Sequence, residues 1–586
     1  MSANCAMFCA IDIGSSYSGY AFAPRKTLAN GSNEISASHW ESDLLSHKTP
    51  TTVLLDSTMN FHAFGHTANK KFTKLTENKE NTDWFYFQDF KMELYDKNLT
   101  RESMIADIHG KYASAQGIFA ESIKFLRGHF LDKLKSCNLG VLEDTIYYVV
   151  TVPAIWSDAA KQFTLEAAVM AGICPGRLQL AYEPEVAALY CKQLTAGRTV
   201  EHGQLSQMFV IERPYVVVDL GGGTSDITVQ KISSAGKIQN LHKASGGPWG
   251  GNKINKYFVE LFVKLFGDSL FHQFCVENMD DFFELLQRIE IKKRIITEDE
   301  NDNFILEFPS TLVDMYGKKF KLHESILQHA IEKADLQETV TVKKGNKICV
   351  KHAFFQPQFK EICTKTIDLV KDIIQKEMQC HNLRSLIMVG GFSESKLVQS
   401  MFKKSFPEYD IKIPLDAGLA VLKGAVIYGF DSSIIQTRVC PYTYGIAVLK
   451  KFNPNIHEPS KSFVEDGQLR ADDCFEKFFE VDEPLAIGVK RSISVNISHV
   501  EESRQKDRTE PKEIEVFSST MKSPMYTTDA TCRPHGMISV YPPNGKWPVH
   551  VRGRVEIEVT GTDNFSITYI DDITGHTASG TIDFLK

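Results

Sequence analysis

Short, mostly apolar runs that lead into glycine- or proline-containing turns recur through the first 430 residues of this chain. They comprise Phe8 to Ile11, Ile146 to Val152, Tyr215 to Val218 and Ser385 to Val389. Runs of this kind are typical of strands that are covered on both faces. We therefore predict strands in buried sheets, with a further short strand at Leu178 to Tyr182.

Helical periodicity appears between these strands. From Gly117 to Leu134 apolar residues recur every three or four positions, as on one face of a helix. Ser157 is placed to cap a second helix that stops at Gly172. Further helices are expected at Val186 to Lys192, Asn252 to Phe266 and Asp280 to Ile295. Because the order of elements repeats, we predict two related lobes, about 1–205 and 206–430.

Residues 28–100 differ from their surroundings. They are polar, rich in turn residues and short of helical periodicity. We expect them to form an insertion that caps a cleft.

After Phe430 the pattern alternates with a period of two. Ile493, Val495 and Ile497 alternate with polar residues, as in a strand with one buried face. Turn residues separate such segments, which are 491–500, 513–517, 536–541, 554–559 and 564–570. We predict a separate antiparallel β domain over residues 431–586.

Two acidic, glycine-edged turns follow the first strand of each predicted lobe. Their residues are Asp12, Gly14, Ser15, Ser16 and Tyr17, and Asp219, Gly221, Gly222, Gly223, Thr224 and Asp226. Glycine lets backbone N–H groups approach phosphate oxygens closely. Mg²⁺ keeps most of its waters and needs few carboxylates, so Asp12, Asp219 and Asp226 are candidates for its shell. Together the two turns predict a nucleotide clamp.

Composition narrows the class of protein. The chain is 43% hydrophobic and 24% charged, as in ordinary globular proteins. A net charge of -7 without a basic cluster argues against nucleic acid as the main partner. No apolar stretch approaches the roughly 20 residues that cross a bilayer, so no transmembrane segment is expected.

The N-terminus and the cysteines indicate a cytoplasmic protein, with the nucleus as an alternative location. No Lys or Arg precedes Arg25, which is the wrong layout for a cleavable signal peptide. The 12 cysteines are scattered and include no Cys-x-x-Cys pair, so we expect free thiols in a reducing compartment.

Several segments resemble, in order, the actin-like ATPase domain of the seventy-kilodalton heat-shock protein family. They are Asp12 to Tyr17, Val150 to Ala154, Glu183-Pro184 with Ala187-Ala188, Asp219 to Asp226 and Met388 to Gly391; Gly250-Gly251-Asn252 takes the place of that family's second-lobe Gly-Gly-acid turn. The resemblance implies an α/β, actin-like (ribonuclease-H-like) ATPase domain of two lobes over residues 1–430.

The same resemblance implies roles for individual residues, with ATP or ADP and Mg²⁺ as ligands. Ser15 and Thr224 match hydroxyl residues at the γ-phosphate, and Glu183 matches an acid near the metal. Lys91 matches a lysine that positions water and stabilises the transferred phosphoryl group. Residues matched to adenosine and phosphate binding are Glu290, Lys293 and Arg294, which share a helix face, and Gly250, Gly251, Gly390, Gly391 and Phe392.

Residues 431–586 resemble the family's substrate-binding β-sandwich, most clearly from Phe565 to Gly575. Three departures stand out. Ser433 to Arg438 replaces the acidic interdomain linker, the helical lid is missing, and Glu394 follows Phe392 where an arginine ordinarily faces the adenine. Such departures are typical of the atypical, 12A/12B-like branch of the family.

Two functions stay open at this point. One is a chaperone-like protein with slow Mg-dependent ATP hydrolysis, which binds a protein or peptide client through its β domain. The other is a nucleotide-gated interaction or scaffold module with vestigial hydrolysis and a dedicated partner. Either is compatible with a nucleotide-exchange or co-chaperone partner. A metabolite kinase on the same fold is disfavoured, because we find no separate catalytic-base motif.

Overall fold

The protein divides into two compact units. The computed structural model describes residues 5–32, 34–40, 46–95, 98–195, 209–299, 303–378, 383–465, 467–498, 506–542, 545–560 and 565–585. One unit comprises Met1–Thr228 and Ser245–Ser432, and the other comprises Val229–Ala244 and Ser433–Lys586. The second unit thus includes a ribbon from the middle of the chain, which the sequence pattern does not reveal. The ranges 1–430 and 431–586 remain predictions of domain organisation.

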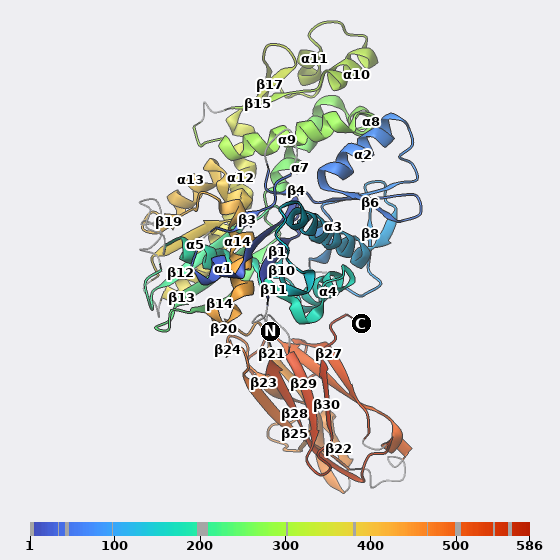
Figure 1. The fold of residues 1–586 in the computed structure, drawn as a ribbon, viewed down its shortest axis with the longest axis vertical. Helices are drawn as coiled ribbons and strands as arrows, with labels where there is room; N and C mark the ends of the chain where they lie inside the picture. Colours follow the sequence, from blue (N-terminus) through green and yellow to red (C-terminus); the bar gives the residue numbers. More distant parts are fainter. Residues whose placement is uncertain are drawn as a thin grey trace. The chain divides into compact units, whose positions relative to one another are not determined.

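The first lobe is built on a buried mixed sheet with the order β11-β10-β1-β2-β3, in which β4 also pairs with β2 (Figure 1). The strands are β1 (Met7–Asp12), β2 (Tyr17–Pro24), β3 (Ser36–Ala37), β4 (Thr49–Pro50), β10 (Ile146–Val152) and β11 (Leu178–Tyr182). β1 is parallel to β10, antiparallel to β2 and buried at every position. Helices α3 (Ala115–Ser136) and α14 (Ala420–Phe430) pack on it, which accounts for the apolar run from Met7 to Ile11.

The second lobe repeats this arrangement. Its sheet runs β19-β18-β12-β13, with β12 (Pro214–Leu220), β13 (Ser225–Ile232), β18 (Ser385–Val389) and β19 (Asp410–Lys412). Again a central strand is followed by an antiparallel partner and lies parallel to a distant strand, with Asp219 opposite Val389. The strands and helices predicted for both lobes are confirmed, including α4 (Asp158–Met170), whose N-cap Ser157 accepts from Ala160 N–H.

Residues 28–100 are more regular than expected. They contain a sheet of β5 (Thr52–Leu55), β6 (Phe61–Phe64) and β7 (Phe85–Gln88), and the helix α2 (Gly65–Glu77). The sequence pattern did not reveal this helix. The buried face of α2 is narrow, with Ala68, Phe72 and Leu75 amid Lys and Thr, and it packs on Tyr86 and on Met279 of α9 (Met279–Ile295). Tertiary packing of this narrow face, rather than strong periodicity, stabilises the helix.

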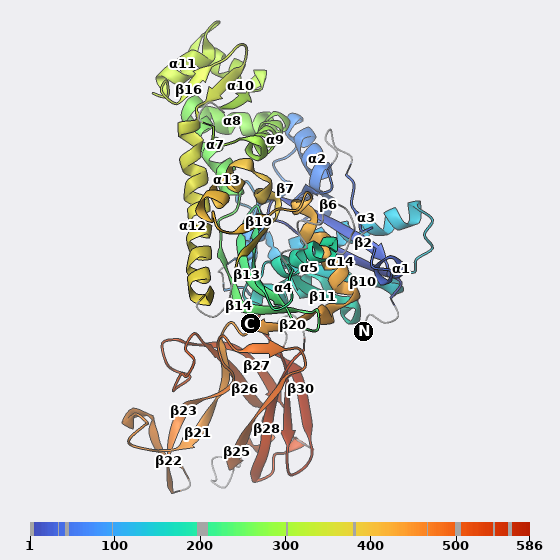
Figure 2. The same cartoon turned by 90° about the vertical axis from the view of Figure 1, so that its left-hand side faces the viewer.

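The remainder of the second lobe is largely helical. Figures 1 and 2 show α9 beside α2, with a small β-sheet and α10 and α11 beyond it. The elements are α7 (Asn252–Phe266), α8 (Asp268–Glu277), β15 (Phe304–Glu307), α10 (Ser310–Phe320), α11 (Ile326–Lys333), β16 (Val340–Val342), β17 (Lys347–Val350), α12 (His352–Met378) and α13 (Lys396–Ser405).

The second unit contains two antiparallel sheets, ordered β22-β23-β21-β26-β27 and β25-β28-β29-β30. Their strands are β21 (Thr443–Lys451), β22 (Ser462–Glu465), β23 (Gln468–Phe479), β25 (Lys490–Ser498), β26 (Lys512–Ser519), β27 (Cys532–Val540), β28 (His550–Val559), β29 (Phe565–Asp571) and β30 (Thr577–Thr581). Tyr444, Val516 and Ile538 of one sheet share a core with Val555 and Ile567 of the other. The five segments predicted from alternation are confirmed as β25 to β29.

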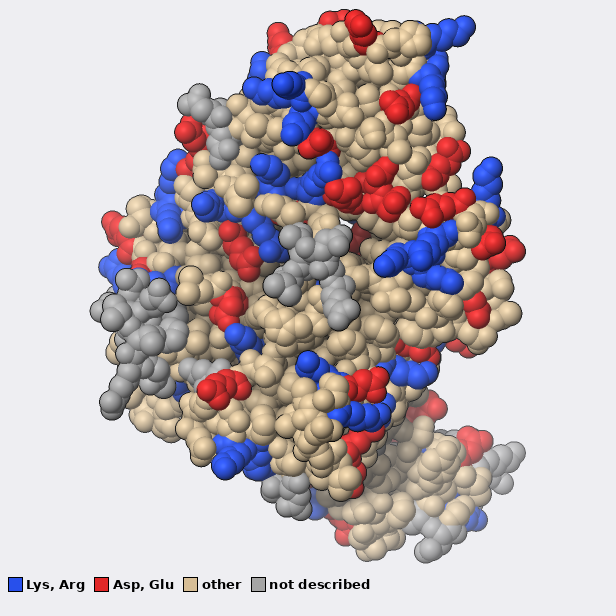
Figure 3. Space-filling view, turned by 45° about the horizontal axis from the view of Figure 1, so that its top comes forward, with Lys and Arg blue, Asp and Glu red and all other residues tan. Residues whose placement is uncertain are grey.

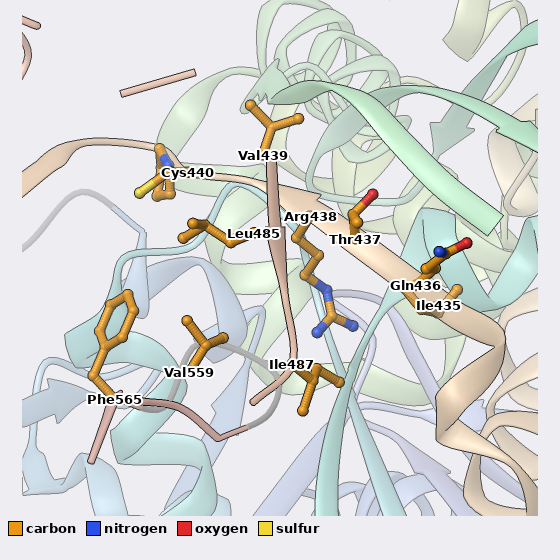
Figure 4. A pocket seen from close by; sticks show the side chains of 11 residues that line it. Ile435, Gln436, Thr437, Arg438, Val439, Cys440, Leu485, Ile487, Val559 and Phe565 are labelled. Carbon is orange, nitrogen blue, oxygen red and sulfur yellow. The ribbon is translucent and has the colours of Figure 1, made fainter. Parts of the chain in front are cut away.

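The segment that replaces the usual interdomain linker is part of a β-ladder. β20 (Ile435–Val439) pairs in parallel with β14 (Ile238–Gly247) and antiparallel with β24 (Pro484–Ala486). Figure 4 shows Leu485 pointing toward Val559 and Phe565 around a small pocket beside β20. Its volume of about 40 Å³ is far below the several hundred Å³ of ligand pockets, so it is a packing gap.

Two further properties concern the described residues as a whole. Within these residues no helix is both long and apolar enough to span a membrane. Figure 3 shows acidic and basic side chains interspersed over one face, with a hollow between groups of opposite charge.

Candidate functional site

The first glycine-edged turn is held from one side by Thr51. The Thr51 hydroxyl donates to the Gly14 carbonyl at 2.7 Å, and the Thr51 N–H donates to the Ser16 carbonyl at 2.9 Å. In a trans peptide the C=O and the following N–H point in opposite directions. The Ser15 and Tyr17 N–H groups are thereby turned away from Thr51.

The second turn is held in the same way by Gly250, Gly251 and Asn252. Their N–H groups donate to the carbonyls of Gly223, Gly221 and Gly222 at 3.0, 3.0 and 2.9 Å, in that order. A Cβ on Gly250 would lie 2.2 Å from the Gly222 oxygen, so this approach requires glycine. The two sequence motifs, 27 residues apart, therefore form one structural unit that turns the N–H groups of Gly222 to Thr224 the other way.

Both turns line one cavity in the first unit, with a volume of about 590 Å³. This size lies within the range of small-molecule and cofactor sites. The cavity brings together nearly all residues predicted for the site, namely Asp12, Gly14, Ser15, Ser16, Tyr17, Lys91, Glu183, Asp219, Gly221, Gly222, Gly223, Thr224, Gly251, Glu290, Lys293, Arg294, Gly390, Gly391 and Phe392. Gly250 supports the second turn from behind, and Asp226 is buried next to it.

Asp12 carries two hydrogen bonds at the end of β1. Lys48 Nζ lies 2.7 Å from Oδ2, and the Thr151 hydroxyl donates to Oδ1 at 3.0 Å. Burial raises the pKa of Asp12, but the charges of Lys48 and Lys91 and these hydrogen bonds outweigh it and hold the pKa below its ordinary value. Asp12 is therefore ionised.

Lys91 and Glu183 form a second buried ion pair, with Nζ 2.8 Å from Oε1. Lys91 comes from the short 3-10 helix η2 (Phe90–Leu94), and Glu183 is the first residue of α5 (Glu183–Thr195). Burial lowers the pKa of Lys91, but Glu183, Asp12 and Asp226 raise it overall. Lys91 also lies 5.4 Å from the centre of the Trp156 ring. Its ammonium is thus charged and held in place on two sides.

Asp219 and Asp226 lack comparable compensation. Burial, followed by the charges of Glu183, Asp226 and Asp12, raises the pKa of Asp219 well above its ordinary value. Burial also raises the pKa of Asp226, although the Ile155 N–H donates to its Oδ1 at 3.1 Å. Both carboxyls gain from a bound cation.

The carboxyl cluster fits a hydrated divalent cation beside phosphate. Four buried carboxyls, Asp12, Glu183, Asp219 and Asp226, face two lysines, which leaves a formal charge of -2. Among the described residues no three His, Cys, Asp or Glu side chains are arranged to hold a metal by themselves. Mg²⁺ takes most of its ligands from water and phosphate and therefore needs few protein carboxylates. The assignment of Asp12, Asp219 and Asp226 to its shell stays a prediction.

The opposite end of the cavity is formed by α9. Lys293 is buried and donates to Glu290 Oε1 at 2.5 Å, to the Gly251 carbonyl at 3.1 Å and to Asn255 Oδ1 at 3.1 Å. Burial lowers the pKa of Lys293 despite the Glu290 charge. Lys293 therefore connects Glu290 to the Gly250-Gly251 turn. These hydrogen bonds link the predicted adenosine-binding residues of the cavity to its predicted phosphate-binding turn.

Arg294 and Glu394 form a more exposed ion pair at the same end of the cavity. Arg294 Nη1 lies 3.4 Å from Glu394 Oε2, and the Gly418 N–H donates to Glu394 Oε1 at 3.2 Å. Phe392 is buried beside Gly251 and packs on Phe359. The carboxylate that replaces an arginine is therefore paired with the neighbouring arginine of the predicted adenosine group.

Hydrogen bonds also cross from one lobe to the other. Ser16 donates to Asn252 Oδ1 at 2.5 Å, and Asn252 Nδ2 donates to Asp89 Oδ1 at 3.0 Å. Beside this bridge a second cavity of about 1020 Å³ is lined by Lys70 and Lys74 of α2 and by acidic residues of α9. The two cavities share Ser16 and Asn252 and therefore adjoin.

Sequence reasoning missed Lys48 and Thr51. Both flank Pro50 in a segment that reads as a polar turn, and neither belongs to a glycine motif. The pairing of β4 with β2, which places Pro50 opposite Tyr17, brings them to the first turn. Only the charge of Lys48 near the apolar Val53-Leu54-Leu55 run could have drawn attention to it.

The two lobes have similar sheets, and in each lobe the central strand leads into an acidic glycine turn that lines the same charged cavity. This arrangement defines a two-lobed protein of the actin-like ATPase class. Comparison with known proteins identifies the family. Residues 113–462 match the family described as Hsp70 protein. The chain belongs to the Hsp70 family, whose members generally bind ATP or ADP with Mg²⁺ and protein clients.

Relatives of this chain include proteins of the atypical branch expected from the sequence. Heat shock 70 kDa protein 12A of Homo sapiens is 30% identical over 642 aligned residues, which cover 98% of this chain and 91% of the relative. The protein of the same name from Mus musculus shows the same identity and coverage. Heat shock 70 kDa protein 12B of Homo sapiens is 30% identical over 547 residues, which cover 82% of this chain and 77% of the relative.

Proposed function

We propose that this protein is an ATP-binding, chaperone-like protein with slow Mg-dependent ATP hydrolysis. The observation that carries the proposal is the single cavity in which two sets of backbone N–H groups meet the Lys91–Glu183 pair. ATP or ADP would lie with its phosphates between the two turns and its adenosine toward Glu290, Lys293 and Arg294. Asp12, Asp219 and Asp226 would hold the hydrated Mg²⁺.

The residues of the chain supply positioning and charge. The N–H groups that follow Gly14 and Gly221 to Gly223 donate to phosphate oxygens, and the hydroxyls of Ser15 and Thr224 lie at the same end. Glu183 holds the Lys91 ammonium at this end of the cavity, where it stabilises negative charge on the transferred group. Bound Mg²⁺ would neutralise phosphate charge and polarise the phosphoryl group.

Single-turnover hydrolysis tests this proposal. Lys91→Met and Asp226→Ala are expected to slow hydrolysis of bound ATP by about a hundredfold or more. Lys91→Met removes a positive charge that acts on the transferred phosphoryl group, and Asp226→Ala removes a carboxylate proposed to hold Mg²⁺. Asp132→Ala, at a 77% exposed position on α3, is the matched control and should leave the rate unchanged. If the wild type binds ATP but hydrolyses it no faster than buffer alone does, the ATPase part of the proposal is refuted and only nucleotide binding remains.

That outcome would favour the second candidate function, a nucleotide-gated interaction module with vestigial hydrolysis. One observation favours it: Lys48 binds Asp12, so a protein cation already occupies one of the metal-shell carboxylates. Binding and release of nucleotide would then set the state of the cleft without chemistry.

For the second unit we propose a β-sandwich that binds an extended protein or peptide segment. The shared core of its two sheets supports a sandwich. From Ser433 onward the described helices are single 3-10 turns, so none of them forms a lid. At the β22–β23 hairpin the cross-strand pair Val464 and Leu469 is 69% and 47% exposed, a small apolar contact surface.

A labelled unfolded peptide tests the client surface in the full chain. Val464→Asp is expected to weaken binding by about tenfold, because a charge replaces apolar contact area. Met104→Asp changes a 53% exposed apolar residue of the first unit and should have no effect. Equal binding by wild type and Val464→Asp would place the client site elsewhere.

A further inference from the structure

Lys48 brings an ammonium group to the predicted phosphate end of the cavity. It lines that cavity together with Ser15 and Lys91, and its Nζ lies 2.7 Å from Asp12 Oδ2. The Lys48 side chain is 21% exposed, whereas that of Asp12 is 6% exposed. The ammonium group therefore lies at the boundary between the buried carboxyl cluster and the open cavity.

The backbone rather than the ion pair places Lys48 there. Thr49 and Pro50 pair with Ser18 and Tyr17 at the start of β2. On the other side of Lys48, its N–H donates to the Ser46 hydroxyl at 3.2 Å. Since main-chain contacts on both sides anchor the residue, its side chain is available for a role in binding.

An ammonium group has three N–H donors and the Asp12 oxygen takes one of them. A terminal phosphate held by the first turn would approach Asp12 from the cavity, and two like charges would then meet in a partly buried site. A divalent cation relieves this repulsion, and so does a lysine in contact with the same carboxylate. Lys91 forms its ion pair with Glu183, so of these two lysines Lys48 is the one whose ammonium group contacts Asp12.

We propose that Lys48 is a positioning residue that serves as a built-in counter-cation between Asp12 and the terminal phosphate of a nucleoside triphosphate. The pocket then retains the nucleotide with a reduced requirement for Mg²⁺. This inference rests on the nucleotide binding proposed above and specifies how one end of that site works.

The test compares ATP affinity, measured by titration calorimetry on the full chain, in excess Mg²⁺ and in EDTA. Lys48→Gln is expected to weaken binding by about tenfold or more in EDTA, the loss of one charge-assisted hydrogen bond, and by clearly less in Mg²⁺. Lys48→Arg keeps the charge and should retain most of the affinity in EDTA. Lys161→Gln is the matched control, since Lys161 is buried, lies 3.3 Å from Asp158 and does not line the cavity.

Several results would overturn the inference. A loss in Lys48→Gln that is equal with and without Mg²⁺ would mean a purely structural role, and no loss would mean no role. A wild-type affinity that collapses by about a hundredfold or more in EDTA would also contradict it, without any variant. Absence of ATP binding by the wild type in either condition would instead refute the nucleotide-binding function itself.

Discussion

The Lys91 ammonium lies 2.8 Å from the Glu183 carboxylate, and both side chains are buried. The two residues are 92 positions apart and are joined where the η2 segment meets the start of α5. Asp12 and Asp226 raise the pKa of both partners. Lys91 therefore keeps its proton, while Glu183 is the member of the pair whose charge responds to pH.

The first prediction concerns the pH dependence of stability. Burial raises the pKa of Glu183 to about 7 from 4.5, with Lys91 opposing the shift. Between these two pH values the folded protein holds a proton that the unfolded chain releases. The contribution of Glu183 to the free energy of unfolding is therefore fully present below pH 4.5 and is lost as the pH rises through 7. Between these values the wild type should lose up to about 1.4 kcal/mol per pH unit relative to Glu183→Gln.

Urea unfolding of the ligand-free wild type and Glu183→Gln over this pH range measures the difference. Titrating groups outside the buried carboxyl cluster are common to both proteins and cancel in the comparison. A difference that stays constant with pH would show that Glu183 titrates near its ordinary value.

The second prediction concerns the Gly250 contact. Gly250→Ala places a Cβ 2.2 Å from the Gly222 oxygen, so the second turn must move. ATP affinity should fall by about tenfold or more, because the N–H groups of this turn lose their alignment. Gly128→Ala is the control: a Cβ there meets nothing within 4 Å, and the change in α3 should stabilise the protein by about 0.5–1 kcal/mol. If Gly250→Ala binds ATP as tightly as the wild type does, the second turn does not contribute to phosphate binding.

A third prediction contrasts two ion pairs at the predicted adenosine end. Lys293→Met leaves Glu290 buried without its cation and should cost about 3–5 kcal/mol of unfolding free energy. Glu394→Gln changes a pair whose Arg294 side chain is 51% exposed, and it should alter stability by less than about 1 kcal/mol. Thermal unfolding and ATP titration together distinguish the two variants. Glu394→Gln should change the affinity for ATP but leave the melting temperature of the ligand-free protein nearly unchanged. Similar stability losses in both variants would contradict this contrast.

The fourth prediction concerns the contact between α2 and α9. Met279 is 6% exposed and packs among Phe72, Leu75 and Tyr86. Met279→Ala should reduce the free energy of unfolding by about 2–5 kcal/mol through lost apolar burial and a residual cavity. Hydrogen exchange should increase in α2 above all, because α2 gets part of its stability from this packing. Exposed Met170→Ala on α4 is the control. Unchanged exchange in α2 would mean that the helix is stable on its own.

Much of the first unit was predictable because its signals are local. The fully buried strand Ile146–Val152, the Ser157 cap and the acidic glycine turns are each signalled by fewer than about ten residues. Alternation predicted β25 to β29 for the same reason. Helix α2 was not predicted, because its narrow apolar face packs on Met279 and Tyr86, which lie elsewhere in the chain.

The strands, the glycine turns and the family resemblance follow from the sequence alone, as do the carboxylates of the site and its lysines except Lys48. Backbone preferences and apolar patterning are properties of short segments, so these features need no knowledge of the chain path. Which charges meet depends on the tertiary fold, which pairs Lys48 with Asp12, Lys91 with Glu183, and Arg294 with Glu394. It also joined the Gly250 turn to the Gly221–Gly223 turn. Charge pairs and hydrogen bonds act over a few ångströms, so they depend on how strands such as β4 are folded back onto the site.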